Sequence, residues 1–131
     1  MAEQKVITQL QNRDQEVRQH ELAHASTGGS VTGAPSYSFE IGPDGKRYAV
    51  GGEVSVDLSS VSGDPHATIT KMQKVHAAAL APANPSPQDT RVAASASRAI
   101  LQAQSEILVQ QDDESSKVSR GLTSGTSAKA T

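Results

Sequence analysis

The segment YSFEIGPDGKRYAV, residues 37–50, decides the fold of this chain. Its first half alternates apolar and polar side chains, a pattern typical of a strand with one covered face. The GPDG stretch at 42–45 has Pro second and Gly fourth, which predicts a tight turn before the returning strand. The segment is therefore predicted to be a β-hairpin. The glycines at 51–52 are expected to break it, and residues 54–58 then resume strand-like alternation.

A helix is predicted before the hairpin, from Val6 to about Ser26. Apolar and imidazole side chains recur there at spacings of three, four or seven, so they share one side of the helix. This stripe consists of Val6, Leu10, Val17, His20 and His24. Its middle is polar, because Arg13 and Asp14 occupy the inward turn. The glycines at 28–29 are expected to end the helix.

Two more helices are predicted after the hairpin. The Asp-Pro pair at 64–65 suits an N-cap followed by the first helical position, and this helix should run to about Leu80. The SPQD stretch at 86–89 opens the last helix in the same way, with Asp89 favourable near the positive helix end. That helix is expected to end between residues 108 and 114.

The fold class predicted from these elements is α+β, with three helices and a small antiparallel hairpin between the first and second. We divide the chain into one domain, residues 1–111, and a disordered low-complexity tail, residues 112–131. The core should be thin, because only 35% of the 131 residues are apolar and Phe39, Tyr37 and Tyr48 are the only aromatic ones. A bound metal would add stability.

Charge and cysteine content exclude several classes of function. The net charge is -2 without a basic block, which argues against nucleic acid or an anionic membrane as partner. The chain has no Cys, so a metal must be held by His and carboxylates, which suits zinc. No signal peptide or transmembrane segment is evident, and we expect a cytoplasmic protein. The first helix begins so soon after Met1 that the natural protein could be longer.

The sequence HELAH, residues 20–24, is an H-E-x-x-H motif. Residues four apart on a helix lie one turn above each other, so His20 and His24 can reach one zinc ion. Glu21 is offset by about 100° from His20, beside the metal, where its carboxylate can act as general base toward a zinc-activated water. The alternative is a pair of hydrogen-bonded His packed under the sheet, and by composition the motif arises by chance in roughly one such chain in a hundred.

A catalytic zinc usually has three protein ligands and one open position, so a third ligand is required. We favour Glu53, because the glycines at 51–52 let the backbone pass close to the helix and its carboxylate lies among apolar neighbours. Asp57, His66 and His76 remain alternatives. Asp57 could instead orient a ligand His, and the two His are also suited to the surface.

A hydrogen-bond donor for an oxyanion is the remaining catalytic requirement. Tyr48 is the first choice because it is nearest to Glu53 in sequence, with Tyr37 and the two remaining His as alternatives. An equally good interpretation is that Tyr48 only packs across the hairpin.

Several motifs in order resemble the SprA-related family, which is described as bacterial zinc metalloproteases. They are RDxEVRxHExAH followed by GG (residues 13–29), YxF through GPDG to YAVGGEV (37–54), DP (64–65) and KMxxV to AAALAP (71–82). The resemblance covers roughly residues 10–110. It implies metal ligation by His20 and His24, a base at Glu21, and support for Glu53 within the Gly-Gly-Glu segment.

The sequence thus predicts a zinc-dependent metallopeptidase, a hydrolase that cleaves amide bonds of a peptide or protein substrate. Few residues precede the motif helix, so a sheet edge for an extended substrate would have to come from the downstream hairpin. The alternative is a non-catalytic, metal-stabilised structural or protein-binding module. A metal-free pseudoenzyme is the third possibility. The substrate and the oligomeric state do not follow from the sequence.

Overall fold

A computed structural model describes residues 2–119 and has the α+β fold expected from the sequence. The fold consists of three helices and a two-stranded antiparallel sheet, which lies between the first and second helix in the chain. In chain order the elements are α1 (Ala2–Gly28), the 3-10 helix η1 (Gly29–Val31), β1 (Ser36–Ile41), β2 (Arg47–Glu53), α2 (Pro65–Ala79) and α3 (Pro87–Ser119).

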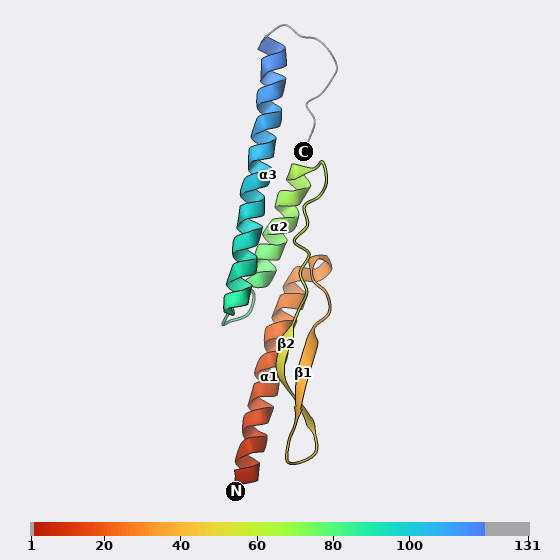
Figure 1. The fold of residues 1–131 in the computed structure, drawn as a ribbon, viewed down its shortest axis with the longest axis vertical. Helices are drawn as coiled ribbons and strands as arrows, with labels where there is room; N and C mark the ends of the chain where they lie inside the picture. Colours follow the sequence, from red (N-terminus) through yellow and green to blue (C-terminus); the bar gives the residue numbers. More distant parts are fainter. Residues whose placement is uncertain (1, 120–131) are drawn as a thin grey trace.

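The molecule is elongated and has two halves (Figure 1). The hairpin of β1 and β2 lies along α1, with its turn toward the N-terminal end of that helix (Figure 1). Helices α2 and α3 lie side by side and form the second half. The end of α2 and the start of α3 meet the later turns of α1, and this junction holds the candidate site.

The polar middle of the α1 stripe holds the hairpin in place. The Asp14 carboxylate accepts a hydrogen bond of 2.7 Å from the backbone N–H of Ala49. Arg13 Nε donates to the carbonyl of Val50 at 3.1 Å. Both side chains thus bond to backbone groups of β2. Both residues therefore lie on the side of α1 that faces the hairpin, although Arg13 is exposed and Asp14 is half-buried. Val6 is 40% exposed and lies outside the stripe.

The predicted turn is present, but the predicted break after it is wrong. The backbone N–H of Gly45 donates to the carbonyl of Gly42 at 2.9 Å, and Gly45 has a positive φ of 79° that favours glycine. Strand β2 continues through both glycines at 51–52 to Glu53. Ser38 pairs with Gly51 and Phe39 with Ala49, so one residue bulges out between these pairs.

Residues 54–58, predicted to alternate as a strand, join no sheet. Val56 makes an isolated antiparallel bridge to Thr32. Backbone hydrogen bonds of 3.0 Å from Gly33 to Ser55 and 2.9 Å from Asp57 to Val31 hold the segment against the chain that follows α1. The alternation therefore corresponds to one short stretch of backbone pairing.

Both helix starts in the second half follow the predicted capping chemistry. The Asp64 side chain accepts from the N–H of Ala67 at 3.0 Å, with Pro65 at the first helical position. At α3, Ser86 Oγ accepts from the Asp89 N–H at 3.0 Å, and Asp89 accepts from the Ser86 N–H at 2.9 Å. Helix α3 runs to Ser119, beyond its expected end. The rest of the predicted tail, residues 120–131, lies outside the described residues.

The core is thin, as the composition implied. The cluster at its centre consists of Val31, Met72, Val75 and Ala96, with Val56, Val92, Ala99 and Ile100 packed around it. Met72 and Val75 are the largest fully buried side chains in the described part of the chain. The core therefore lies between η1, α2 and α3. Helix α1 meets this half of the molecule mainly where its later turns contact the end of α2 and the start of α3.

Candidate metal centre

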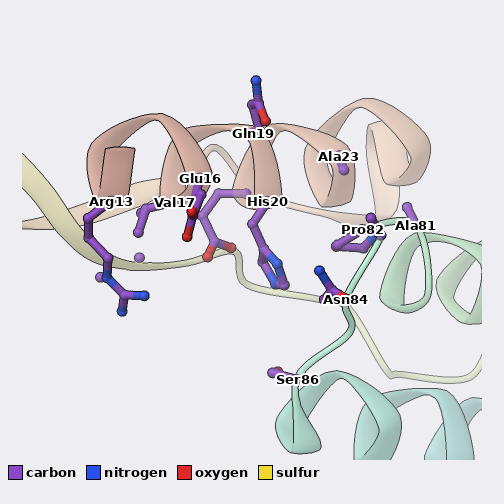
Figure 2. A pocket seen from close by; sticks show the side chains of 14 residues that line it. Arg13, Glu16, Val17, Gln19, His20, Ala23, Ala81, Pro82, Asn84 and Ser86 are labelled. Carbon is purple, nitrogen blue, oxygen red and sulfur yellow. The ribbon is translucent and has the colours of Figure 1, made fainter. Parts of the chain in front are cut away.

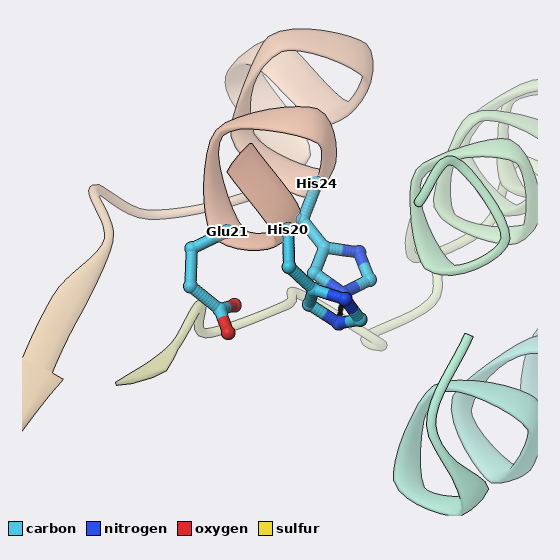
Figure 3. A group of neighbouring side chains, drawn as sticks. All are labelled: His20, Glu21 and His24. Carbon is cyan, nitrogen blue, oxygen red and sulfur yellow. Dashed lines mark hydrogen bonds between the residues drawn. The ribbon is translucent and has the colours of Figure 1, made fainter. Parts of the chain in front are cut away.

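The later turns of α1 present three metal-binding side chains to the junction, namely His20, Glu21 and His24. One ligand atom from each lies within 4.8 Å of the others. His24 and Glu21 are buried, whereas a quarter of the His20 side chain is exposed. Figure 3 shows the two imidazoles meeting on one side of the helix with the Glu21 carboxylate beside them. The helical spacing predicted from the sequence thus produces a compact His–Glu–His group.

The ring of His24 is held by the end of α2. Its Nδ1 lies 2.7 Å from the carbonyl oxygen of Ala78. A carbonyl can only accept, so Nδ1 carries the hydrogen and Nε2 of the neutral ring keeps its lone pair. That Nε2 lies 3.2 Å from Nε2 of His20 (Figure 3). A backbone carbonyl that fixes the ring in this way is a frequent partner of metal-ligating His.

Asp89, in the first turn of α3, contacts both imidazoles. Its Oδ2 lies 3.0 Å from His20 Nε2, and its Oδ1 lies 3.1 Å from His24 Nε2. The sequence indicated Asp89 only as a helix-capping charge. No local signal indicated more, because these contacts depend on how the second half of the molecule packs against α1.

The two carboxyl groups of the site have opposite electrostatic environments. Burial raises the pKa of the Glu21 carboxyl, although His20 and His24 oppose the shift. Burial also disfavours the charged form of Asp89, but the backbone N–H of Ser86 and the imidazoles outweigh this effect and lower its pKa. Two neighbouring carboxyls with divergent pKa values are typical of sites where one is fixed as an anion and the other exchanges a proton.

Gly52 lets Glu21 lie under the hairpin. A Cβ built on Gly52 would lie 2.9 Å from Glu21 Cγ and 3.1 Å from the carbonyl oxygen of Ser36. These distances leave no space for a side chain. The glycines in β2 therefore have a packing role: the strand passes directly over the buried carboxylate.

Two cavities meet at this group. The first, of about 660 Å³, lies between α1, the glycines at 51–52 and the loop at 81–86 (Figure 2). His20, Arg13 and Glu16 project into it from α1, and Asn84 and Ser86 face them from the loop (Figure 2). The second cavity, of about 430 Å³, is lined by His20, Glu21, His24, Glu53, Asp89 and neighbouring residues. The His–Glu–His group is thus accessible from two sides.

The structure brings Glu53 to the same region. Glu53 is exposed at the end of β2 and lines the second cavity with both His. Its charge contributes to the raised pKa of Glu21, although burial of Glu21 is the larger cause. Glu53 is not a member of the group of mutually close ligand atoms, which contains His20, Glu21 and His24. Its role as a metal ligand stays a prediction.

The structure does not bring the other predicted residues to the imidazoles. Tyr48 is buried, and its hydroxyl donates to the Asp44 carboxylate in the hairpin turn. Asp57 pairs with Lys71 at 2.9 Å, and hydrogen bonds from Ser59 and then from Lys71 lower its pKa. His66 and His76 lie on α2, and neither lines the two cavities; nor does Tyr37.

The donor atoms of the junction suit a divalent cation. Two imidazole nitrogens and nearby carboxylate oxygens are the ligands that zinc and similar ions take in a site without Cys. Every buried side-chain polar atom in the described part of the chain has a hydrogen-bond partner. The site is therefore preorganised by its own hydrogen bonds, and the residues present fit a metal ion.

Fold and site together define a small α+β domain whose first helix carries a His–Glu–His group able to hold a metal ion. The chain belongs to the SprA-related family, whose family model matches residues 1–118. No curated protein and no solved structure matches the chain. In the part of the chain that the structure describes, no helix has an apolar stretch long enough to span a membrane.

Proposed function

We propose that this protein is a zinc-dependent hydrolase that cleaves amide bonds in a peptide or protein substrate. The observation that carries the proposal is the convergence of His20, Glu21 and His24, with ligand atoms within 4.8 Å of one another at the meeting point of two cavities. His20 and His24 would hold the ion. A bound zinc ion lowers the pKa of water and polarises a carbonyl group.

Glu21 has the position of a general base in this proposal. Its carboxylate takes a proton from the attacking water as the water oxygen bonds to the carbonyl carbon of the substrate. It then gives that proton to the leaving nitrogen when the carbon–nitrogen bond breaks. Gly52 supports this role because it leaves room for Glu21 to lie close to both imidazoles.

The cavities suggest how an extended peptide would approach. His20, Glu21, Gly52 and Ser86 line both cavities, so a chain that occupies the two would pass over the imidazoles. The glycines at 51–52 line the first cavity, and backbone without side chains can approach a substrate closely. We expect the peptide to bind along this part of β2.

The experiment compares the wild type with Glu21→Gln, using a mixed peptide library as substrate and zinc content as second measurement. The proposal predicts hydrolysis by the wild type, and a rate at least about a hundredfold lower in Glu21→Gln with zinc retained. Glu40→Gln, on the exposed face of β1, is the matched control and should behave as the wild type. A Glu21→Gln protein as active as the wild type would rule out the base role.

A second function is favoured by the thin core. Because the site joins α1 to the second half of the molecule, a bound ion would stabilise the fold without any catalysis. This structural module predicts a large fall in melting temperature on addition of a chelator and no hydrolysis of the library. A metal-free pseudoenzyme predicts an unchanged melting temperature.

A further inference from the structure

The carboxylate of Asp89 is held by its helix cap in a fixed direction. Oδ2 accepts from the Ser86 N–H at 2.9 Å, and the Asp89 N–H donates back to Ser86 Oγ at 3.0 Å. Only 14% of the side chain is exposed. The capping box alone requires one oxygen on the backbone N–H, and it does not require the carboxylate to face two imidazoles. Those additional contacts call for a separate explanation.

The separations among the three side chains match a metal site. His20 Nε2 and His24 Nε2 are 3.2 Å apart, and the Asp89 oxygens lie 3.0 and 3.1 Å from them. Tetrahedral zinc with bonds of about 2.0–2.1 Å holds its ligand atoms about 3.3 Å apart. All three distances are within a few tenths of an ångström of this value, and the two Asp89 distances end on different oxygens of one carboxylate. A small rotation of that carboxylate would direct one oxygen to an ion held by both rings.

The nitrogen and oxygen atoms of the three side chains are directed at one another. His24 Nδ1 is bonded to the carbonyl of Ala78, so Nε2 is the ring atom that faces Asp89 Oδ1. His20 Nε2 faces both Asp89 Oδ2 and His24 Nε2. Imidazole nitrogens and carboxylate oxygens that converge in this way are the ligand set of a zinc site without Cys.

Glu21 and Glu53 fit this position less well. Glu21 lies beside the imidazoles, with a ligand atom within 4.8 Å of theirs, and makes no hydrogen bond to either ring among the described residues. A carboxylate in this position suits a base that acts on a metal-bound water. Glu53 is exposed and has no direct hydrogen bond or ion pair to either imidazole among the described residues. Asp89 is the carboxylate in direct contact with both rings.

We propose that Asp89 is the third protein ligand of the metal ion held by His20 and His24. This inference rests on the proposed metal site and deepens it. In the described residues, every hydrogen bond or ion pair between α1 and α3 ends on Asp89. Metal binding would therefore tie α3 to α1 across the junction and leave Glu21 free as a base.

The first test measures the affinity for Zn²⁺ by competition with a chromophoric chelator. Asp89→Asn keeps the size of the side chain and an acceptor oxygen for the Ser86 N–H, so the cap of α3 is preserved. We expect its affinity to fall at least tenfold, since even partners outside the ligand set contribute about 10- to 100-fold. Asp64→Asn, at the cap of α2, is the matched control and should bind within about threefold of the wild type.

The second test identifies ligation directly. The chain has no Cys, so Asp89→Cys introduces the only thiolate, and Co²⁺ bound to it will show sulfur-to-cobalt charge-transfer absorption. Glu53→Cys is measured in parallel. Absorption in Asp89→Cys supports the inference, with or without absorption in Glu53→Cys. Absorption in Glu53→Cys alone, together with an unchanged Zn²⁺ affinity of Asp89→Asn, overturns it.

The two proposals fail in different ways. A wild type that binds no Zn²⁺ contradicts both the hydrolase and the ligand role of Asp89. A wild type that binds Zn²⁺ as tightly as Asp89→Asn contradicts the ligand role alone. An affinity that depends on Asp89, in a protein that hydrolyses no peptide, supports the ligand role and contradicts the hydrolase. Far-UV circular dichroism of each metal-free variant checks that its helices are intact.

Discussion

The attachment of the hairpin to α1 should be sensitive to one side chain, Asp14. Its carboxylate accepts from the N–H of Ala49, a residue with 0% exposure, at 2.7 Å. Asp14→Ala would leave that donor without a partner. Stranding a buried donor costs about 1–3 kcal/mol, but 24% of the Asp14 side chain is exposed, so water can partly replace it. We therefore expect a loss of about 1–2 kcal/mol in the free energy of unfolding.

Urea unfolding followed by circular dichroism measures this loss, which corresponds to a fall in melting temperature of roughly 4–10 °C for a domain of this size. The exposed ion pair of Asp14 with Arg18 adds only about 0.3–0.5 kcal/mol. Asp14→Asn keeps an acceptor oxygen and should lose less than Asp14→Ala. If the free energy of unfolding of Asp14→Ala lies within about 0.5 kcal/mol of the wild-type value, the change is no larger than that of an ordinary surface substitution. That result would refute the role of Asp14 in holding the hairpin on α1.

The same carboxylate should make the stability of the fold depend on pH, in a direction that follows from its pKa. The hydrogen bond from Ala49 lowers the pKa of Asp14 below its ordinary value of 3.8. A lowered pKa in the folded state stabilises the fold above pH 3.8, and this contribution is lost as the pH falls through the folded-state pKa. The difference in unfolding free energy between the wild type and Asp14→Asn should therefore shrink below pH 3.8. If the difference in unfolding free energy instead grows as the pH falls, the predicted pH dependence is wrong.

Three further predictions concern the strand beside the site, the core and the hairpin. Gly52→Ala would bring a Cβ within 2.9 Å of a neighbouring side chain and should destabilise the fold by about 1–3 kcal/mol in urea unfolding, whereas Gly51→Ala, with its nearest atom at 3.9 Å, should not. Met72→Ala removes a side chain with 0% exposure and should cost about 2–5 kcal/mol; Leu101→Ala, at 63% exposure, should stay within about 0.5 kcal/mol. Tyr48→Phe should leave any rate of peptide hydrolysis unchanged, because its hydroxyl is bonded in the turn, and a drop of about a hundredfold would restore an oxyanion role.

The local elements could be predicted from the sequence because their causes are local. Alternation and the GPDG stretch at 42–45 specify the hairpin, and the capping residues Asp64 and Ser86 specify where α2 and α3 begin. The spacing of His20 and His24 on one helix predicts that their rings meet, as their Nε2 atoms do at 3.2 Å. These features depend on residues a few positions apart.

The features that were missed depend on contacts between distant residues. The glycines at 51–52 have the local character of a strand break, but Gly52 is required where β2 crosses Glu21, more than thirty residues earlier in the chain. Asp89 was already explained by the helix it caps, so nothing local indicated its contacts with His20 and His24. Such contacts appear only when the second half of the molecule is placed against α1.

The zinc content of the purified protein after dialysis against metal-free buffer is the most direct test of the metal site. The proposed site predicts about one zinc ion per chain in the wild type. It predicts close to none in a variant that carries both His20→Ala and His24→Ala, with the helical signal retained. Less than roughly a tenth of an ion per wild-type chain, or an equal content in the double variant, would contradict the existence of the site.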